Sequence, residues 1–264
     1  MKQLPKHIAI TGIYHDSVIK VLSPLNIYHY GLDFRPKSFQ FIPEYQALDM
    51  LSRHREHKIH WYFQFEHILD PMILKLAKDV SELGTFQNTF IFSTDHLIEV
   101  LNKSSNGRNE LTNFLQQENF LLELPQDLFS QDLSSGLLHH LRLARYQMKG
   151  LSGFIIPFDL LKDLLHQGKL RPSLQQLQSI FSEMEVREHQ ASNEAYAELF
   201  SSQFKIVLKC KWGDNLYISL FDYLAINEIH LSIDAKVETH YRQIDNKKIV
   251  NEIRVVRSNF SHSL

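Results

Sequence analysis

Eight short apolar runs, each followed by a segment of helical character, most limit how this 264-residue sequence can fold. The runs are too short to be helices, whereas the segments between them have apolar residues three or four positions apart. The predicted strands are 8–10, 28–34, 58–65, 89–92, 120–124, 153–157, 205–211 and 228–234. Eight such alternations in a chain of this length favour a closed (β/α)8 TIM barrel over an open doubly wound sheet.

The connection between the sixth and seventh predicted strands is longer than one crossover helix needs. Helical periodicity occurs twice within it, in 173–185 and in 193–200. The segments 214–224 and 245–256 are predicted to be the helices after the seventh and eighth strands. We therefore predict one barrel domain over residues 1–264, with extra helical material inserted at about 160–203.

Composition argues against several classes of protein. Hydrophobic residues make up 44% of the chain, which allows a large core, and the formal charge of −2 with no basic run predicts neither nucleic acid nor a membrane surface as partner. The single cysteine, Cys210, excludes an internal disulfide or a multi-cysteine zinc site. No apolar segment is long enough for a signal peptide or a membrane span, so we expect a cytoplasmic protein. Nothing in the sequence predicts an oligomeric state.

Polar side chains follow most of the predicted strands. The carboxyl ends of the strands carry the active site in (β/α)8 barrels, so we expect these side chains to meet at one mouth. They are Asp33, Arg35, Lys37, Gln64, Glu66, Asp95, His96, Asp159, Lys209, Lys211, Asp234 and Lys236. The carboxylates could perform acid–base chemistry or hold a divalent cation, but mixed charges at strand ends can also simply pair with one another. No close metal-binding spacing is present, so we predict no metal and no other cofactor; most of the 15 histidines are interpreted as scattered surface residues.

The segment 30–42 carries a more specific pattern. Gly31, Phe34, Pro36, Lys37 and Ser38 match the order of residues in the second strand and following loop of phosphoribosylanthranilate isomerase, and the chain resembles that family here. The segment 8–13 is similar to the first strand of the family, and 232–238 to a degraded form of its motif at the eighth strand. The resemblance covers nearly the whole chain, and it implies the same barrel fold.

The resemblance also implies a chemistry from which this sequence departs. The family uses a cysteine after the first strand as general base and an aspartate after the sixth as general acid. Thr11 stands at the position of the cysteine, and Gln40 at that of an arginine that holds the substrate carboxylate. Asp159 is the candidate acid, either at the end of the sixth strand or as the cap of the next helix. The turns that hold phosphate in the family are nearly free of glycine here, so Lys211 and Lys236 are the candidate replacements.

Two functions are compatible with these patterns. The first is an isomerase-like enzyme that acts on, or binds, a small sugar-derived or anionic metabolite without running the standard Amadori isomerisation. Its candidate catalytic residues are Thr11, Asp33, Glu66 and Asp159, and its candidate ligand-binding residues are Arg35, Lys37, Gln40, Gln64, Asp95, Lys211, Asp234 and Lys236. The second is a non-catalytic barrel that binds a ligand or a protein. In the first case the expected partner is a small molecule, sugar-derived or anionic.

Overall fold

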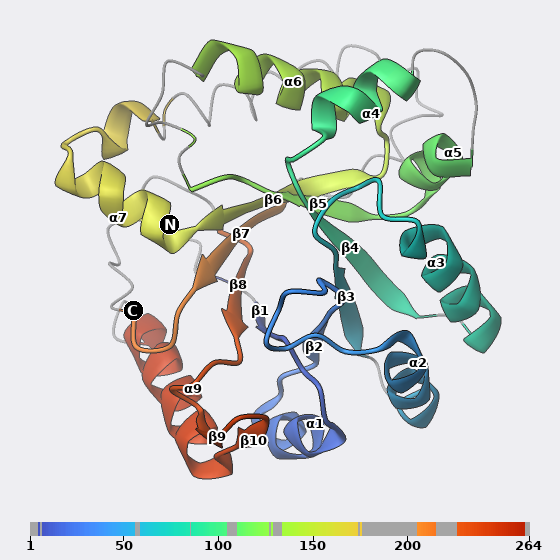
Figure 1. Ribbon diagram of the computed structural model, residues 1–264. Coiled ribbons are helices and arrows are strands. Elements are labelled where there is room, and N and C mark those ends of the chain that lie inside the picture. The colour runs from blue at the N-terminus through green and yellow to red at the C-terminus, as the bar shows by residue number, and fades with distance from the viewer. Residues whose placement is uncertain are drawn as a thin grey trace, which may run out of the picture.

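The computed structural model is a closed barrel of eight parallel strands with helices outside it (Figure 1). It describes residues 5, 7–55, 59–84, 86–104, 110–126, 128, 134–173, 175, 205–214 and 226–261. The strands follow chain order round the barrel, and β8 closes onto β1. They are β1 His7–Thr11, β2 His29–Asp33, β3 His60–Gln64, β4 Gln87–Ser93, β5 Phe120–Glu123, β6 Leu151–Pro157, β7 Lys205–Cys210 and β8 Glu228–Ser232. The predicted (β/α)8 fold is confirmed, with strand ends displaced by a few residues at most.

Helices connect the strands and cover the barrel from outside. They are α1 Asp16–Leu22, α2 Glu44–Arg53, α3 Met72–Leu83, α4 Leu97–Ser104, α5 Glu110–Gln117, α6 Ser134–Gln147, α7 Phe158–His166 and α9 Asn246–Ser261, with a short 3-10 helix at Ser23–Leu25. In α3, Ile73, Leu76 and Val80 are buried, because a spacing of three and four places them on one face of the helix. The predicted segments 193–200 and 215–224, and the part of the predicted insertion beyond residue 175, lie outside the described residues. Among the described helices, none is both long and apolar enough to cross a bilayer.

A small hairpin between β8 and α9 was not predicted. Its strands are β9 Glu238–His240 and β10 Gln243–Ile244, and Arg242 in its turn has a φ of 58°. An isolated hairpin of this length is marginal in water, so tertiary contacts must hold it. Arg242 supplies them: its guanidinium donates to the carbonyl of Phe41 and lies 5.3 Å from the ring centre of Tyr14. The hairpin therefore ties the loop after β8 to the loop after β2.

The barrel interior changes from apolar to polar along its axis. Its middle level is an apolar cluster of Ala9, Tyr62, Ile91, Leu121, Ile155 and Val207. At the carboxyl ends of the strands, the register pairs Thr11 with Ser232, Asp33 with Gln64, and Ser93 with Glu123. Since alternate residues of a strand face the same way, these polar residues lie one level above the apolar cluster. The mouth of the barrel is therefore polar, and the layer of side chains below it is apolar.

A second polar cluster lies at the opposite end of the barrel interior. The buried Glu228 accepts a hydrogen bond from Tyr62 Oη at 2.7 Å and contacts His29 Nδ1 at 2.8 Å, and His230 Nε2 lies 3.6 Å from the same carboxylate. Burial by itself would raise the pKa of Glu228, but His230 and His29 hold it well below its ordinary value. The interpretation of most histidines as scattered surface residues does not extend to His230, which is 2% exposed inside the barrel, and it is wrong for His54, which is 8% exposed.

Strands β1 and β2 approach closely at Gly31, so we expect a larger side chain there to lower the stability of the protein. A Cβ added there would lie 2.7 Å from Cγ2 and 3.0 Å from Cα of Thr11. Because a backbone atom is among those contacts, we expect Gly31→Ala to lower the free energy of unfolding by about 1–3 kcal/mol in urea melts. Gly136→Ala in α6 is the control, since nothing lies within 4 Å of its added Cβ and alanine favours helix. Equal stability of the two variants would contradict the prediction.

Candidate functional site

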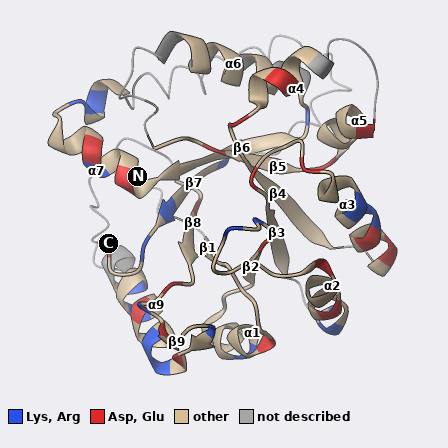
Figure 2. Cartoon of the chain, in the orientation of Figure 1, with Lys and Arg blue, Asp and Glu red and all other residues tan. Residues whose placement is uncertain are grey.

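A cavity of about 820 Å³ opens at the carboxyl ends of the strands. This volume is within the range of small-molecule sites in proteins. The predicted site residues that line it are Arg35, Lys37, Gln40, Gln64, Glu66, Asp95, Asp159, Lys211 and Asp234. They come from the ends of β2, β3, β4, β6, β7 and β8, and Figure 2 shows acidic and basic residues intermixed in the loops at this end of the barrel. Closure of the barrel is what brings these distant segments together.

Three of the candidate catalytic and ligand-binding residues do not line the cavity, and neither does His96, which was predicted to lie at the mouth. Thr11 is buried below it and shares a hydrogen bond of 2.8 Å with the hydroxyl of Ser232, which does line it. Asp33 is buried behind Arg35, and Lys236 Nζ lies 3.4 Å from Glu252. The hydroxyl at the position of the family's thiol base therefore has a partner of its own and no direct access to a ligand.

Asp33 holds the loop that follows β2. Its carboxylate accepts hydrogen bonds from Arg35 Nε at 2.9 Å and Nη2 at 2.6 Å, from the Arg35 backbone N–H at 3.0 Å, and from Ser38 Oγ at 2.7 Å. Its carbonyl accepts from the N–H of Ile42 at 2.8 Å, so both ends of the loop are fixed to this one residue. Burial alone would lower the pKa of Arg35, but the hydrogen bonds and charge of Asp33 raise it. Arg35 is thus a fixed cation at the mouth.

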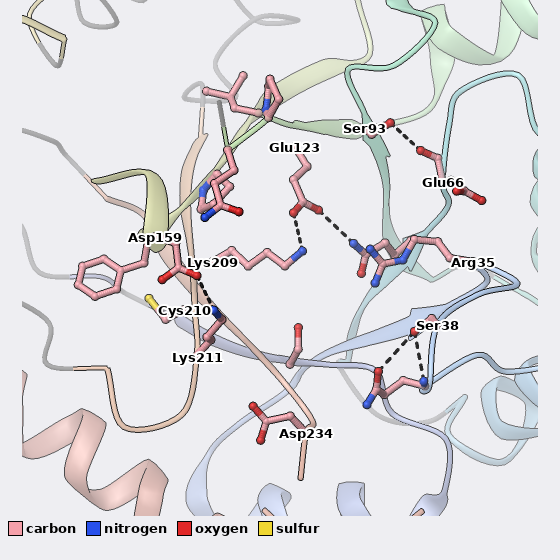
Figure 3. Close-up of a pocket in the computed structure, with 18 of the residues that line it drawn as sticks. Arg35, Ser38, Glu66, Ser93, Glu123, Asp159, Lys209, Cys210, Lys211 and Asp234 are labelled. Atoms are coloured by element: carbon pink, nitrogen blue, oxygen red, sulfur yellow. Dashed lines mark hydrogen bonds and ion pairs between the residues drawn. The ribbon is translucent and has the colours of Figure 1, made fainter. Parts of the chain in front are cut away.

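A chain of polar contacts crosses the top of the barrel interior. Lys209 Nζ forms an ion pair with Glu123, and Gln64 Nε2 donates to the other oxygen of that carboxylate at 3.1 Å. Figure 3 shows Glu123, Lys209 and Arg35 pointing towards one another in the centre of the mouth. Glu123 was not among the predicted site residues. A signal was present, because Glu123 is a charged residue next to the carboxyl end of the predicted strand 120–124.

Asp159 lies in the first turn of α7, directly after β6, with Pro157 as the N-cap residue. It is therefore both at the end of the sixth strand and within the helix, without being its cap. Lys162 contacts one carboxylate oxygen, and Lys211 Nζ lies 2.5 Å from the other. These two hydrogen-bonded ammonium groups hold the pKa of Asp159 below its usual value. At neutral pH Asp159 is an anion between two cations, whereas a general acid must carry a proton.

Three other carboxylates of the cavity have no ion pair with any described residue: Glu66, Asp95 and Asp234. Among the described residues, Asp234 Oδ1 accepts a hydrogen bond from the backbone N–H of Lys236, at 2.9 Å. Burial raises the pKa of Asp234, and Lys236 lowers it only in part. A carboxyl group in a cavity whose pKa is moved towards neutrality is a candidate for proton transfer.

Two other chemistries lack support in the described part of the chain. No group of three or more His, Cys, Asp or Glu side chains there could hold a metal ion. Cys210 ends β7 and borders the cavity, but its pKa is raised well above the ordinary thiol value, chiefly by burial. Because the thiolate is the nucleophilic form, this thiol is not activated.

The fold and the cavity place the chain among (β/α)8 barrels with a polar mouth. No protein-family model and no curated protein sequence matches it. Among solved structures, the phosphoribosylanthranilate isomerase of Thermotoga maritima is similar, with 13% identity over 96% of this chain and 98% of that one and a TM-score of 0.58. TrpF from Jonesia denitrificans has 11% identity over 96% and 97%, with a TM-score of 0.50. A structure described as a phosphonomutase from Burkholderia cenocepacia has 8% identity over 100% and 95%, with a TM-score of 0.51.

At such low identities, these similarities show a shared fold and not a shared family. The resemblance seen in the sequence is supported to that extent. Barrels of this kind host many unrelated reactions, so function must be argued from the cavity itself.

Proposed function

We propose that this protein is an isomerase-like enzyme that moves a proton within a small sugar-derived metabolite bound in the cavity. The observation that carries the proposal is the placement of Asp234, without an ion pair to any described residue, in one cavity with the fixed cations Arg35 and Lys209. The fold shared with an isomerase is consistent with this proposal.

An aldose–ketose conversion needs a proton acceptor, a proton donor and a group that stabilises negative charge on the carbonyl oxygen. In the proposed reaction, Asp234 removes the proton from the carbon beside the carbonyl. The carbonyl oxygen becomes an enediolate oxygen that Arg35 and Lys209 stabilise. The protonated Asp234 then returns the proton to the former carbonyl carbon. The carbon that lost its C–H proton becomes the new carbonyl carbon, and its hydroxyl proton passes to the enediolate oxygen. Asp33 acts as a positioning residue because its oxygens are occupied by Arg35 and Ser38.

The standard reaction of phosphoribosylanthranilate isomerase is not what we propose. Thr11 is outside the cavity, and Asp159 is held as an anion by two lysines. The same two observations favour the alternative function, a barrel that binds a ligand without converting it. Measurement of substrate turnover distinguishes the enzyme from the non-catalytic barrel. A cytoplasmic location stays a prediction for both functions.

Asp234→Asn is expected to lower kcat by at least about 100-fold, the usual contribution of a positioned base, with little change in KM. The assay is a screen of aldoses and ketoses for interconversion, followed by steady-state kinetics on the best substrate. Because the base acts in its ionised form and its pKa is raised above 3.8, the wild-type rate should rise with pH through a limb above that value.

Asp163→Asn is the matched control, since it alters an exposed aspartate of α7 outside the cavity and should leave kcat unchanged. If Asp234→Asn kept the wild-type kcat, the assignment of the base would be wrong. If the wild type bound a sugar in the cavity but converted none, the non-catalytic alternative would hold.

A further inference from the structure

We propose that the cavity takes an unphosphorylated sugar and discriminates against the corresponding sugar phosphate. This inference rests on the proposed function and specifies the substrate class of the same site. Three features of the mouth carry it: the backbone donors after β7 and β8, the balance of charge round the cavity, and one exposed aromatic ring.

The turns after β7 and β8 have aspartates of this chain where an anion would bind. In (β/α)8 barrels, the loops after the seventh and eighth strands frequently bind phosphate through backbone N–H groups. Here the N–H of Lys211 donates to Asp214 Oδ2 at 2.7 Å, and the N–H of Lys236 donates to Asp234 Oδ1 at 2.9 Å. A phosphate placed on these turns would have to displace two carboxylates, or lie beside them at a cost in like-charge repulsion.

The lysines near these turns are already paired. Lys211 and Lys162 both bind Asp159, and Lys162 Nζ also lies 3.2 Å from Asp214. Lys236 Nζ is 3.4 Å from Glu252. A phosphate dianion would therefore have to compete with carboxylates for each of these ammonium groups.

The cavity as a whole has more carboxylates than cations among its described lining residues. The carboxylates are Glu66, Asp95, Glu123, Asp159, Asp214 and Asp234. The cations are Arg35, Lys37, Lys209 and Lys211. Because both signs are present with an acidic excess, the field suits a neutral molecule with many hydroxyl groups better than a dianion. Each sugar hydroxyl can donate to a carboxylate and accept from a lysine or arginine.

Phe39 provides an apolar surface on which a sugar ring can pack. Its side chain lies in the loop after β2, lines the cavity and is 76% exposed, which leaves a large apolar surface in contact with water at a polar mouth. A sugar ring has a face of C–H groups as well as a rim of hydroxyls. Packing that face on Phe39 would remove apolar surface of both partners from water.

Binding to the full chain tests the inference, with ribose, ribose 5-phosphate, glucose, glucose 6-phosphate and inorganic phosphate as ligands in calorimetric titrations. We expect each free sugar to bind at least tenfold more tightly than its phosphate ester. Phe39→Ala should weaken binding of the free sugar about tenfold, whereas Tyr45→Ala, which removes an exposed ring of α2 outside the cavity, should not. Asp214→Asn should raise the affinity for inorganic phosphate, because it removes a negative charge next to the N–H of Lys211.

The outcomes separate the two proposals. Equal or tighter binding of the phosphate esters would overturn the inference and leave the proposed function standing. Binding of neither free nor phosphorylated sugars would overturn the proposed function, and the inference with it. A phosphate affinity unchanged by Asp214→Asn would contradict the argument from charge.

Discussion

Glu228→Ala is expected to lower the free energy of unfolding by about 4 kcal/mol, because it removes the acceptor of a buried network. Glu228 is 2% exposed, and its carboxylate oxygens are 2.7 Å from Tyr62 Oη and 2.8 Å from His29 Nδ1. Without the carboxylate, the buried hydroxyl of Tyr62 and the partly buried imidazole of His29 would each lose this partner, and a cavity would form beside them. Urea unfolding followed by circular dichroism measures the loss.

Two control variants distinguish the stability lost with the hydrogen-bond network from the stability lost by simply removing side-chain atoms. Tyr62→Phe removes one donor and keeps the ring, so we expect a loss of about 1 kcal/mol. Glu82→Ala removes a carboxylate on the surface of α3, 3.9 Å from Lys78, and should change stability by no more than about 0.5 kcal/mol. A Glu228→Ala protein as stable as the Glu82→Ala protein would refute the account of the buried cluster.

The loss in Glu228→Ala should also depend on pH. The pKa of Glu228 is held well below its ordinary value of 4.5 in the folded state, so the unfolded chain binds the proton more readily. Its stabilising contribution is therefore complete above about pH 4.5 and decreases as the pH falls. The difference between wild type and variant should become smaller over the same range.

Asp33→Ala is expected to have the second largest effect, a loss of about 3 kcal/mol in the free energy of unfolding together with the loss of ligand binding. The substitution leaves the guanidinium of Arg35, whose side chain is only 33% exposed, without its carboxylate partner. It also removes the acceptor of Ser38 Oγ, so the loop that presents Arg35, Lys37 and Phe39 to the cavity loses its anchor. Urea unfolding and titration with the best ligand of the wild type measure the two effects.

A double-mutant cycle that combines Asp33→Ala with Arg35→Met measures the interaction energy between Asp33 and Arg35. If Asp33 acts mainly by holding Arg35, the double variant should be more stable than the sum of the two single losses predicts. Ser38→Ala, which removes one hydrogen bond to the same carboxylate, should cost about 1 kcal/mol. Strict additivity in the cycle would show that the two residues stabilise the loop independently.

The predicted strand ends were a good guide to the cavity because a barrel brings all of its carboxyl ends to one side. Arg35, Glu66, Asp159 and Lys211 follow different strands, and all of them line the cavity. Glu123 obeys the same rule, since it lies next to the carboxyl end of the fifth strand and lines the cavity. The buried cluster follows no such rule. Glu228 is 166 positions from Tyr62 and 199 positions from His29 in the sequence, so no local pattern indicates that these residues meet.

The amino-acid sequence alone determined the fold of this protein, because the alternation of apolar strands and amphipathic helices is a local property and leaves few ways to bury the apolar faces. It also determined most of the polar side chains that reach the mouth of the barrel, although Asp33, His96 and Lys236 do not line the cavity and Glu123 does. Tertiary structure alone decided their states: Asp159 is an anion between two lysines, Asp33 is an anchor for Arg35, and Asp234 has no cationic partner among the described residues. Charge, protonation and access depend on neighbours and on burial, and these exist only once the strands have closed into a barrel.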